Sequence, residues 1–88
     1  MADIVKGKVI KVVDGDTFDL QITHIGNNNA YEYGTVERIR IAGKDAPELN
    51  TLLGLAVKRR VTEKLLNQIV TCEIQSKDVY GRLVAKIR

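Results

Sequence analysis

Residues 4–25, IVKGKVIKVVDGDTFDLQITHI, predict the pair of strands around which the rest of the chain is arranged. Ile4 to Val13 is rich in β-branched residues and leads into Asp14-Gly15, a dipeptide typical of hairpin turns. Thr17 to Ile25 alternates apolar and polar residues, which gives a strand one apolar face and one polar face. The stretch therefore predicts a hairpin of two paired strands, one face of which lies in a core.

A loop and a third strand follow this hairpin. Gly26 to Asn29 is expected to form the loop, because Gly and Asn tolerate positive φ. We expect Tyr31 and Tyr33 to extend the hairpin, and Val36 to Ile41 to form the third strand.

A change of period predicts one amphipathic helix from Leu52 to Leu66. Its apolar residues recur at a spacing of four, which predicts a buried face of Leu53, Val57, Val61 and Leu65, with Ala56 and Leu66 alongside. The opposite face is charged and carries Lys58, Arg59, Arg60, Glu63 and Lys64. Two further strands are expected at Ile69 to Gln75 and Leu83 to Ile87, with a turn at Lys77 to Gly81 between them.

The expected order is β-β-β-α-β-β within a single domain, residues 1–88. A helix between the third and fourth of five strands is the arrangement of an OB-fold, a small all-β Greek-key barrel that often binds nucleic acids or sugar polymers. The sequence therefore predicts an all-β fold, a five-stranded OB-fold barrel with one α-helix.

Composition limits the classes of function. The formal net charge is +3 and the pI about 9.2, which favours a polyanionic partner, whereas an aromatic content of 5% argues against a broad base-stacking platform. Cys72 is the single cysteine and lies in an apolar run, where a buried thiol is expected. No apolar run approaches the roughly 20 residues of a membrane helix, so no membrane association is expected. The N-terminus lacks the pattern of a secretion signal, which favours the cytoplasm if this N-terminus is native.

Three polar clusters each lie at the end of a predicted strand. They are Asp14-Gly15-Asp16-Thr17, then Arg40 with Asp45-Ala46-Pro47-Glu48, then Asp78-Val79-Tyr80-Gly81-Arg82. Each cluster taken alone predicts a turn or a loop. The turns do not require Asp16, Tyr80 or Arg82, however, and carboxylates bind hard cations while arginines bind phosphate. If the clusters converge, they suit cleavage of a phosphodiester.

Arg40 lies on the third predicted strand, where the alternation is ambiguous. Arg38 and Arg40 share one face, opposite Ile39 and Ile41. Alternation alone leaves open which face is buried. An arginine at the rim of a barrel requires an anion, which Asp45 or a phosphate could supply.

Together the clusters resemble the signature of the staphylococcal-type nucleases, or thermonucleases: V-x-D-G-D-T, an arginine strand leading to D-x-P-E, and D-x-Y-G-R. The resemblance spans nearly the whole chain. It implies an OB barrel that hydrolyses DNA and RNA with calcium. By this resemblance Asp16, Asp45 and the backbone carbonyl of Ala46 bind the calcium, and Glu48 orients or deprotonates the attacking water.

The resemblance also implies roles for the remaining residues of the clusters. Arg40 and Arg82 bind the phosphate, and Tyr80, with Asp78, contacts the substrate. Asp14 and Thr17 support the calcium ligand Asp16. An all-oxygen donor set suits calcium or magnesium better than zinc.

The chain departs from the family pattern in two respects. Ala46 stands where a small hydroxyl residue is often found, and the helices that usually follow the barrel are missing from this sequence. We therefore expect a barrel core with an uncovered side, through which two copies could form a homodimer.

The leading hypothesis is a calcium-dependent endonuclease acting on DNA or RNA. The alternatives are an OB-fold module that binds nucleic acid or a protein without cutting, and a truncated core of low activity.

Overall fold

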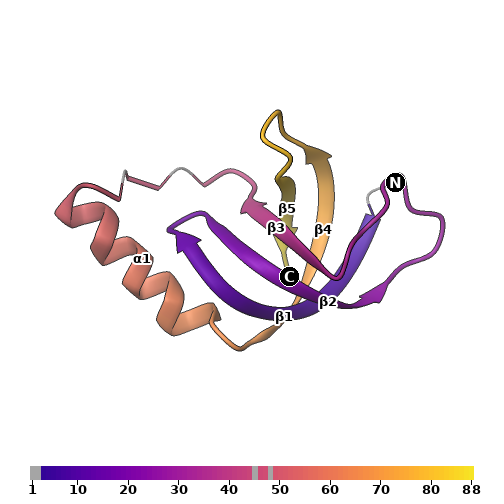
Figure 1. The fold of residues 1–88 in the computed structure, drawn as a ribbon, viewed down its shortest axis with the longest axis horizontal. Coiled ribbons are helices and arrows are strands. Elements are labelled where there is room, and N and C mark those ends of the chain that lie inside the picture. Colours follow the sequence, from indigo (N-terminus) through magenta and orange to yellow (C-terminus); the bar gives the residue numbers. More distant parts are fainter. Residues whose placement is uncertain (1–2, 45, 48) are drawn as a thin grey trace.

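The computed structural model describes residues 3–44, 46, 47 and 49–88, which form five strands and one helix (Figure 1). The elements are β1 (Asp3–Asp14), β2 (Thr17–Ile25), β3 (Val36–Ile41), α1 (Leu52–Leu65), β4 (Ile69–Lys77) and β5 (Leu83–Ile87). The order and the position of the helix confirm the sequence-based expectation, and the predicted strand ends agree within two residues.

The strands close into a barrel in the order β1-β2-β3-β5-β4. All neighbouring pairs are antiparallel except β3 and β5, which run parallel because α1 and β4 lie between them in the chain. β1 closes the barrel, because it pairs with β2 along its length and with β4 through its first half. A side chain at Gly7 would collide with the backbone oxygen of Gln21, so glycine permits the register shift at which β1 bends.

Alternating side chains fill the interior of the barrel. The most deeply buried are Val5, Val9, Phe18, Leu20, Ile39, Cys72, Ile74, Leu83 and Ala85. Phe18 and Leu20 lie on the face of β2 that alternation predicts. Burial raises the pKa of the Cys72 thiol to about 12, so this thiol is a packing group, as expected.

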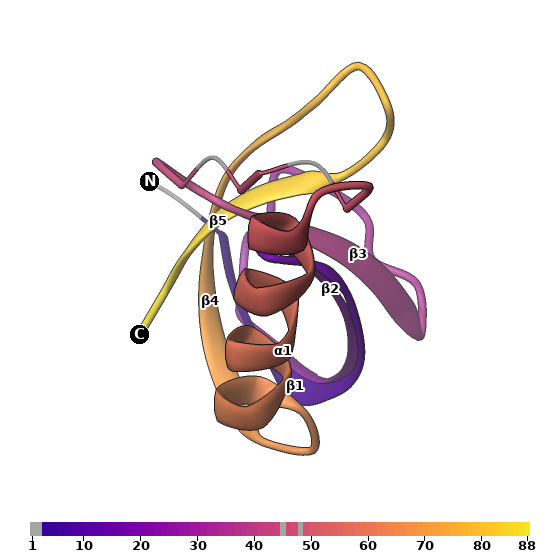
Figure 2. The ribbon, with the colours of Figure 1, turned by 90° about the vertical axis from the view of Figure 1, so that its left-hand side faces the viewer.

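Helix α1 crosses one side of the barrel and packs on β1 (Figure 2). It begins at Thr51, whose side chain accepts a hydrogen bond of 3.0 Å from the Gly54 amide. Gly54 and Val61 are buried and Val57 is half-buried, so the buried face begins one residue later than predicted. The prediction of Leu53 was wrong, because its side chain is 64% exposed, whereas its neighbour Gly54 is buried.

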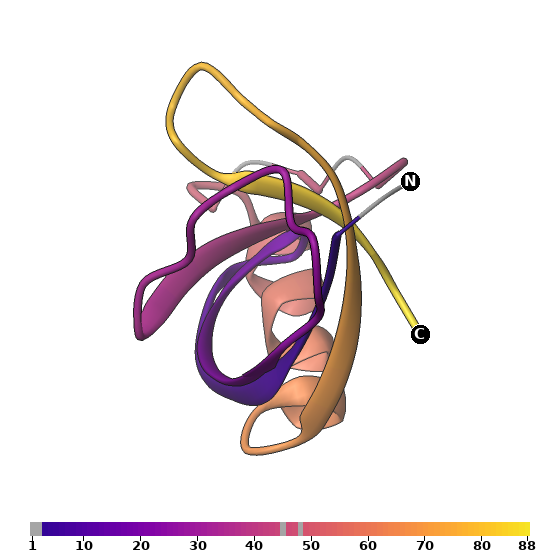
Figure 3. The ribbon, with the colours of Figure 1, turned by 90° about the vertical axis from the view of Figure 1, so that its right-hand side faces the viewer.

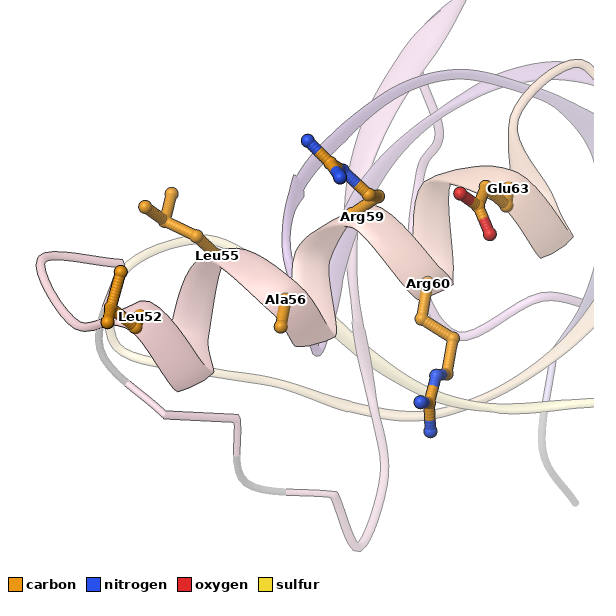
Figure 4. A pocket seen from close by; sticks show the side chains of 6 residues that line it. All are labelled: Leu52, Leu55, Ala56, Arg59, Arg60 and Glu63. Carbon is orange, nitrogen blue, oxygen red and sulfur yellow. The ribbon is translucent and has the colours of Figure 1, made fainter.

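The opposite side of α1 is exposed and partly apolar. Leu52 and Leu55 border a shallow hollow of about 410 Å³ together with Ala56, Arg59, Arg60 and Glu63 (Figure 4). Ala56 is therefore exposed, and Leu66 lies just beyond the last residue of the helix, contrary to expectation.

Tyr31 and Tyr33 do not extend the hairpin, contrary to expectation. Their segment leaves the sheet and runs past the start of β1, where Asp3 holds it (Figure 3). The Asp3 carboxylate accepts hydrogen bonds from the amides of Ala30 and Tyr31 and from the Tyr33 hydroxyl, at 2.8, 3.1 and 2.6 Å. Bonding to a buried carboxylate therefore replaced strand pairing in this segment.

We expect replacement of Asp3 by Asn to destabilise the barrel in a pH-dependent manner. Hydrogen bonds from Tyr33 and the two amides lower the pKa of Asp3 below 3.8, so folding favours its charged form. This stabilisation is complete above about pH 4 and is lost as the pH falls through the lowered pKa. Thermal melts of Asp3→Asn should therefore show a lower Tm than the parent at pH 7, and the difference should shrink in acid. A difference that grows in acid would contradict this assignment. Tyr33→Phe, which removes one of the three bonds, should have a smaller effect.

Candidate active site

All three polar clusters meet at one end of the barrel. A cavity of about 520 Å³ opens there and is lined by Asp14, Asp16, Arg40, Ala46, Pro47, Leu49 and Arg82. The β1–β2 turn, the end of β3 with the loop after it, and the β4–β5 loop each supply part of this lining. Asp45 and Glu48 lie outside the described residues.

The β1–β2 turn presents Asp16 in a fixed orientation. The Asp16 amide donates to Asp14 Oδ1 at 3.0 Å, and the Thr17 hydroxyl donates to Asp16 Oδ1 at 2.9 Å. The Ala46 amide donates to Asp16 Oδ2 at 3.3 Å, which connects the turn to the loop after β3. Asp16 and Thr17 are both buried, so these bonds restrict the carboxylate to one position.

The two carboxylates of this turn differ in their electrostatics. Burial raises the pKa of Asp14, and the neighbouring Asp16 carboxylate raises it further. Burial also raises the pKa of Asp16, but hydrogen bonds from Asp14, Thr17 and the Ala46 amide and the charge of Arg40 together place it below its usual value. Asp16 therefore stays ionised to a lower pH, whereas Asp14 keeps its proton up to a higher pH.

Arg40 reaches the same site from β3. It pairs in register with Thr17, and its Nη2 lies 3.9 Å from Asp16 Oδ2. Ile39 is completely buried, so the arginine face of β3 is the one directed away from the core. On that face Arg38 forms a two-point ion pair with Asp19 at 2.9 and 3.2 Å, and neither residue lines the cavity.

The β4–β5 loop positions Arg82. The Asp78 carboxylate accepts hydrogen bonds from the amides of Tyr80 and Arg82, both at 2.9 Å, and from Arg82 Nε at 2.7 Å. Gly81 adopts φ +83°, which lets the loop turn back. The carboxylate of Asp78 is thus engaged by the loop and by Arg82, and its expected contact with the substrate stays a prediction.

Tyr80 and Thr17 complete the surroundings of Arg82. The guanidinium lies over the Tyr80 ring, 5.5 Å from its centroid, and the ring itself is 82% exposed. Arg82 Nη1 donates to the Thr17 hydroxyl at 3.5 Å, and Thr17 in turn donates to Asp16. Thr17 therefore connects the arginine to the carboxylate, a link that its position after Asp16 does not reveal in the sequence.

The described donors fit a hard cation in their chemistry. Asp14 and Asp16 supply carboxylate oxygens, and a bound cation would offset the repulsion that raises the pKa of Asp14. Within residues 3–44, 46, 47 and 49–88 no three His, Cys, Asp or Glu side chains gather closely enough to hold a metal. The further expected ligand, Asp45, lies outside this part of the chain.

Pro47 and Leu49 also line the cavity, and Leu49 was not predicted to be part of the site. Leu49 lies just before α1, and its apolar side chain belongs to no periodic pattern from which it could have been predicted.

Among the described residues, no helix has the length and apolar character needed to cross a membrane.

Comparison with known proteins gives one distant similarity. No family model matches the chain. A micrococcal nuclease of Shigella flexneri is 27% identical over 82 residues, which cover 93% of this chain and 41% of that protein. The chain therefore spans about two fifths of the length of this relative. The closed barrel and this similarity together indicate a distant relationship to nucleases, at low identity.

Proposed function

We propose that the chain is a calcium-dependent nuclease that hydrolyses phosphodiester bonds of DNA or RNA. The observation that carries the proposal is the cavity in which Asp14 and Asp16 lie beside Arg40 and Arg82. Carboxylates for a hard cation and arginines for a phosphate are the two groups of side chains that this reaction needs. The relative named a micrococcal nuclease supports the same class of activity.

The calcium would be held by Asp16, Asp45 and the backbone carbonyl of Ala46. The hydrogen bond from the Ala46 amide to Asp16 supports this grouping, because it holds two of the three ligand positions side by side. Asp14 and Thr17 orient the Asp16 carboxylate. Calcium in this position supplies a Lewis acid that polarises a phosphoryl oxygen.

Arg40 and Arg82 would bind the scissile phosphate and stabilise the charge that develops on it. Arg82 is already held by Asp78 and Thr17, so little side-chain freedom remains to be lost when the substrate binds. The exposed Tyr80 ring extends beyond Arg82 and offers a hydroxyl to a neighbouring phosphate.

Glu48 would act as the base. Its carboxylate would take a proton from water while the water oxygen forms a bond to phosphorus, and the ester oxygen on the opposite side would leave and take a proton from solvent water. The net positive charge of the chain favours approach of the polyanionic substrate.

The test is cleavage of single-stranded DNA and RNA by this 88-residue chain, with and without calcium, beside Glu48→Gln. We expect cleavage in calcium, none with excess chelator, and a loss in Glu48→Gln on the order of 10²–10⁴-fold, as for removal of a general base. Glu48→Gln keeps the size of the side chain and removes only its ability to accept a proton.

Three outcomes would contradict parts of this proposal. Cleavage that persists in chelator would exclude the calcium role, and full activity of Glu48→Gln would exclude the base. Salt-dependent binding of oligonucleotides with no product after long incubation in calcium would instead favour a binding module.

A further inference from the structure

Gly15, at the tip of the β1–β2 turn, is buried between two segments from elsewhere in the chain. A Cβ atom placed on Gly15 would lie 2.5 Å from Val57 Cγ1 on α1 and 2.8 Å from Ala46 Cβ on the loop after β3. The φ of Gly15 is not in the positive region that favours glycine. Space, and not backbone conformation, therefore demands glycine at this position.

Neither neighbour of Gly15 can yield easily. Val57 is β-branched, and its χ1 is restricted in a helix. Ala46 has only its Cβ, which moves with the backbone. The helix is anchored near this contact by its Thr51 cap and by the buried Gly54. An added methyl group at residue 15 would thus displace the turn, the loop or the helix.

The contact separates two segments that both contribute to the site. The turn presents Asp16, and the loop presents the Ala46 amide, which donates to Asp16 Oδ2 at 3.3 Å. Val57 itself does not line the cavity, and the contact that connects it to the site is the one with Gly15.

We propose that Gly15, Ala46 and Val57 form a spacer contact that sets the separation between the Asp16 turn and the loop after β3. Val57 is then a positioning residue, through which α1 fixes the geometry of the cation site. The consequence for calcium rests on the proposed function, whereas the separation itself can be measured without any metal.

The experiment compares Gly15→Ala, Val57→Ala and the double variant. Two quantities are measured: hydrogen exchange of the Ala46 amide without calcium, and calcium affinity by titration calorimetry. We expect Gly15→Ala to speed exchange of this amide and to weaken calcium binding by about 10–100-fold, the usual effect of disturbing groups that orient a ligand. The double variant should recover part of both, because Val57→Ala removes the 2.5 Å clash with Cγ1 while the 2.8 Å contact with Ala46 Cβ remains.

Gly34→Ala is the matched control. A Cβ on Gly34 would meet its nearest atom, Glu37 Oε2, at 3.9 Å, so the same substitution is made without a clash. It should leave both the Ala46 exchange and the calcium affinity unchanged, while altering the unfolded chain in the same manner.

Gly15→Ala with unchanged exchange would overturn the spacer contact, as would a double variant that recovers nothing. If Gly15→Ala does not fold, Val57→Ala alone decides, because opening a gap beside Gly15 should speed exchange of the Ala46 amide while circular dichroism shows the helix intact. Unchanged exchange in Val57→Ala would then overturn the proposal. If the parent chain binds no calcium, the proposed function fails, and the exchange measurements still decide on the spacer contact.

Discussion

Replacing Arg82 by Ala is expected to slow cleavage on the order of 10²–10³-fold, mainly in kcat, because one donor that stabilises developing phosphoryl charge is lost. The substitution should leave the loop formed. Asp78 still accepts hydrogen bonds from the amides of residues 80 and 82 when the guanidinium is gone. Arg82→Lys should recover little, since an ammonium group cannot make the two-point contact of a guanidinium.

Arg38→Ala is the control for this prediction. It removes the same charge, but Arg38 is paired with Asp19 on the barrel wall and does not line the cavity. Its kcat should remain at the parent value, with only a small change in the salt dependence of substrate binding. Steady-state kinetics on a single-stranded oligonucleotide provide the measurement. Equal losses in the two variants would mean that Arg82 acts through net charge and has no specific place in the reaction.

The barrel could be predicted because local patterns and global topology agree. The alternation in residues 17–25 matches the burial of Phe18 and Leu20, and the change to a helical period gives the correct place of α1. The face of α1 was predicted less well. Leu53 and Gly54 both lie one turn before Val57, and the one that is buried is the residue without a side chain. A periodic pattern of apolar residues does not include glycine, so it could not predict that Gly54 is buried.

The convergence of four motif residues around one cavity could be predicted, but the hydrogen bonds between them could not. Motif spacing identified Asp14, Asp16, Arg40 and Arg82, and the structure brings them together around one cavity. The spacing of the motifs did not reveal that the Asp78 carboxylate accepts a hydrogen bond from Arg82 Nε. Such links depend on side-chain directions at loop ends, which are fixed by tertiary contacts and leave no period in the sequence.

The hydrogen bonds from Ala30, Tyr31 and Tyr33 to the Asp3 carboxylate are a further tertiary contact that the sequence pattern did not predict. The alternating aromatic residues satisfy a strand pattern, yet a carboxylate 27 or more residues away offered better partners for their amides. Long-range hydrogen bonds of this kind override local propensity, because the preference of a segment for a strand depends strongly on its tertiary context.

The second large effect is expected from Asp16→Asn, which should remove stabilisation by calcium. At calcium concentrations near 100 times the parent Kd, binding adds about 2.7 kcal/mol to the stability, which raises the Tm of a domain of this size by roughly 10–20 °C. Residues that only orient a ligand change metal affinity by up to about 10²-fold, so loss of a direct ligand should weaken binding by at least that factor. At the same calcium concentration, the stabilisation by calcium then falls to about 0.4 kcal/mol or less. Thermal melts with calcium and with chelator measure the difference directly.

Asp19→Asn is the matched control, because it makes the same change of charge three residues further along the chain, on β2. Asp19 pairs with Arg38 outside the cavity, so its variant should keep the full calcium-induced rise in Tm. The Asn side chain in Asp16→Asn retains an oxygen that can accept from Thr17, so the fold without calcium should persist. If calcium raises the Tm of Asp16→Asn as much as that of the parent, then the cation binds elsewhere. The buried Asp16 carboxylate, which Thr17 and Ala46 orient, would then act as the ion-pair partner of Arg40.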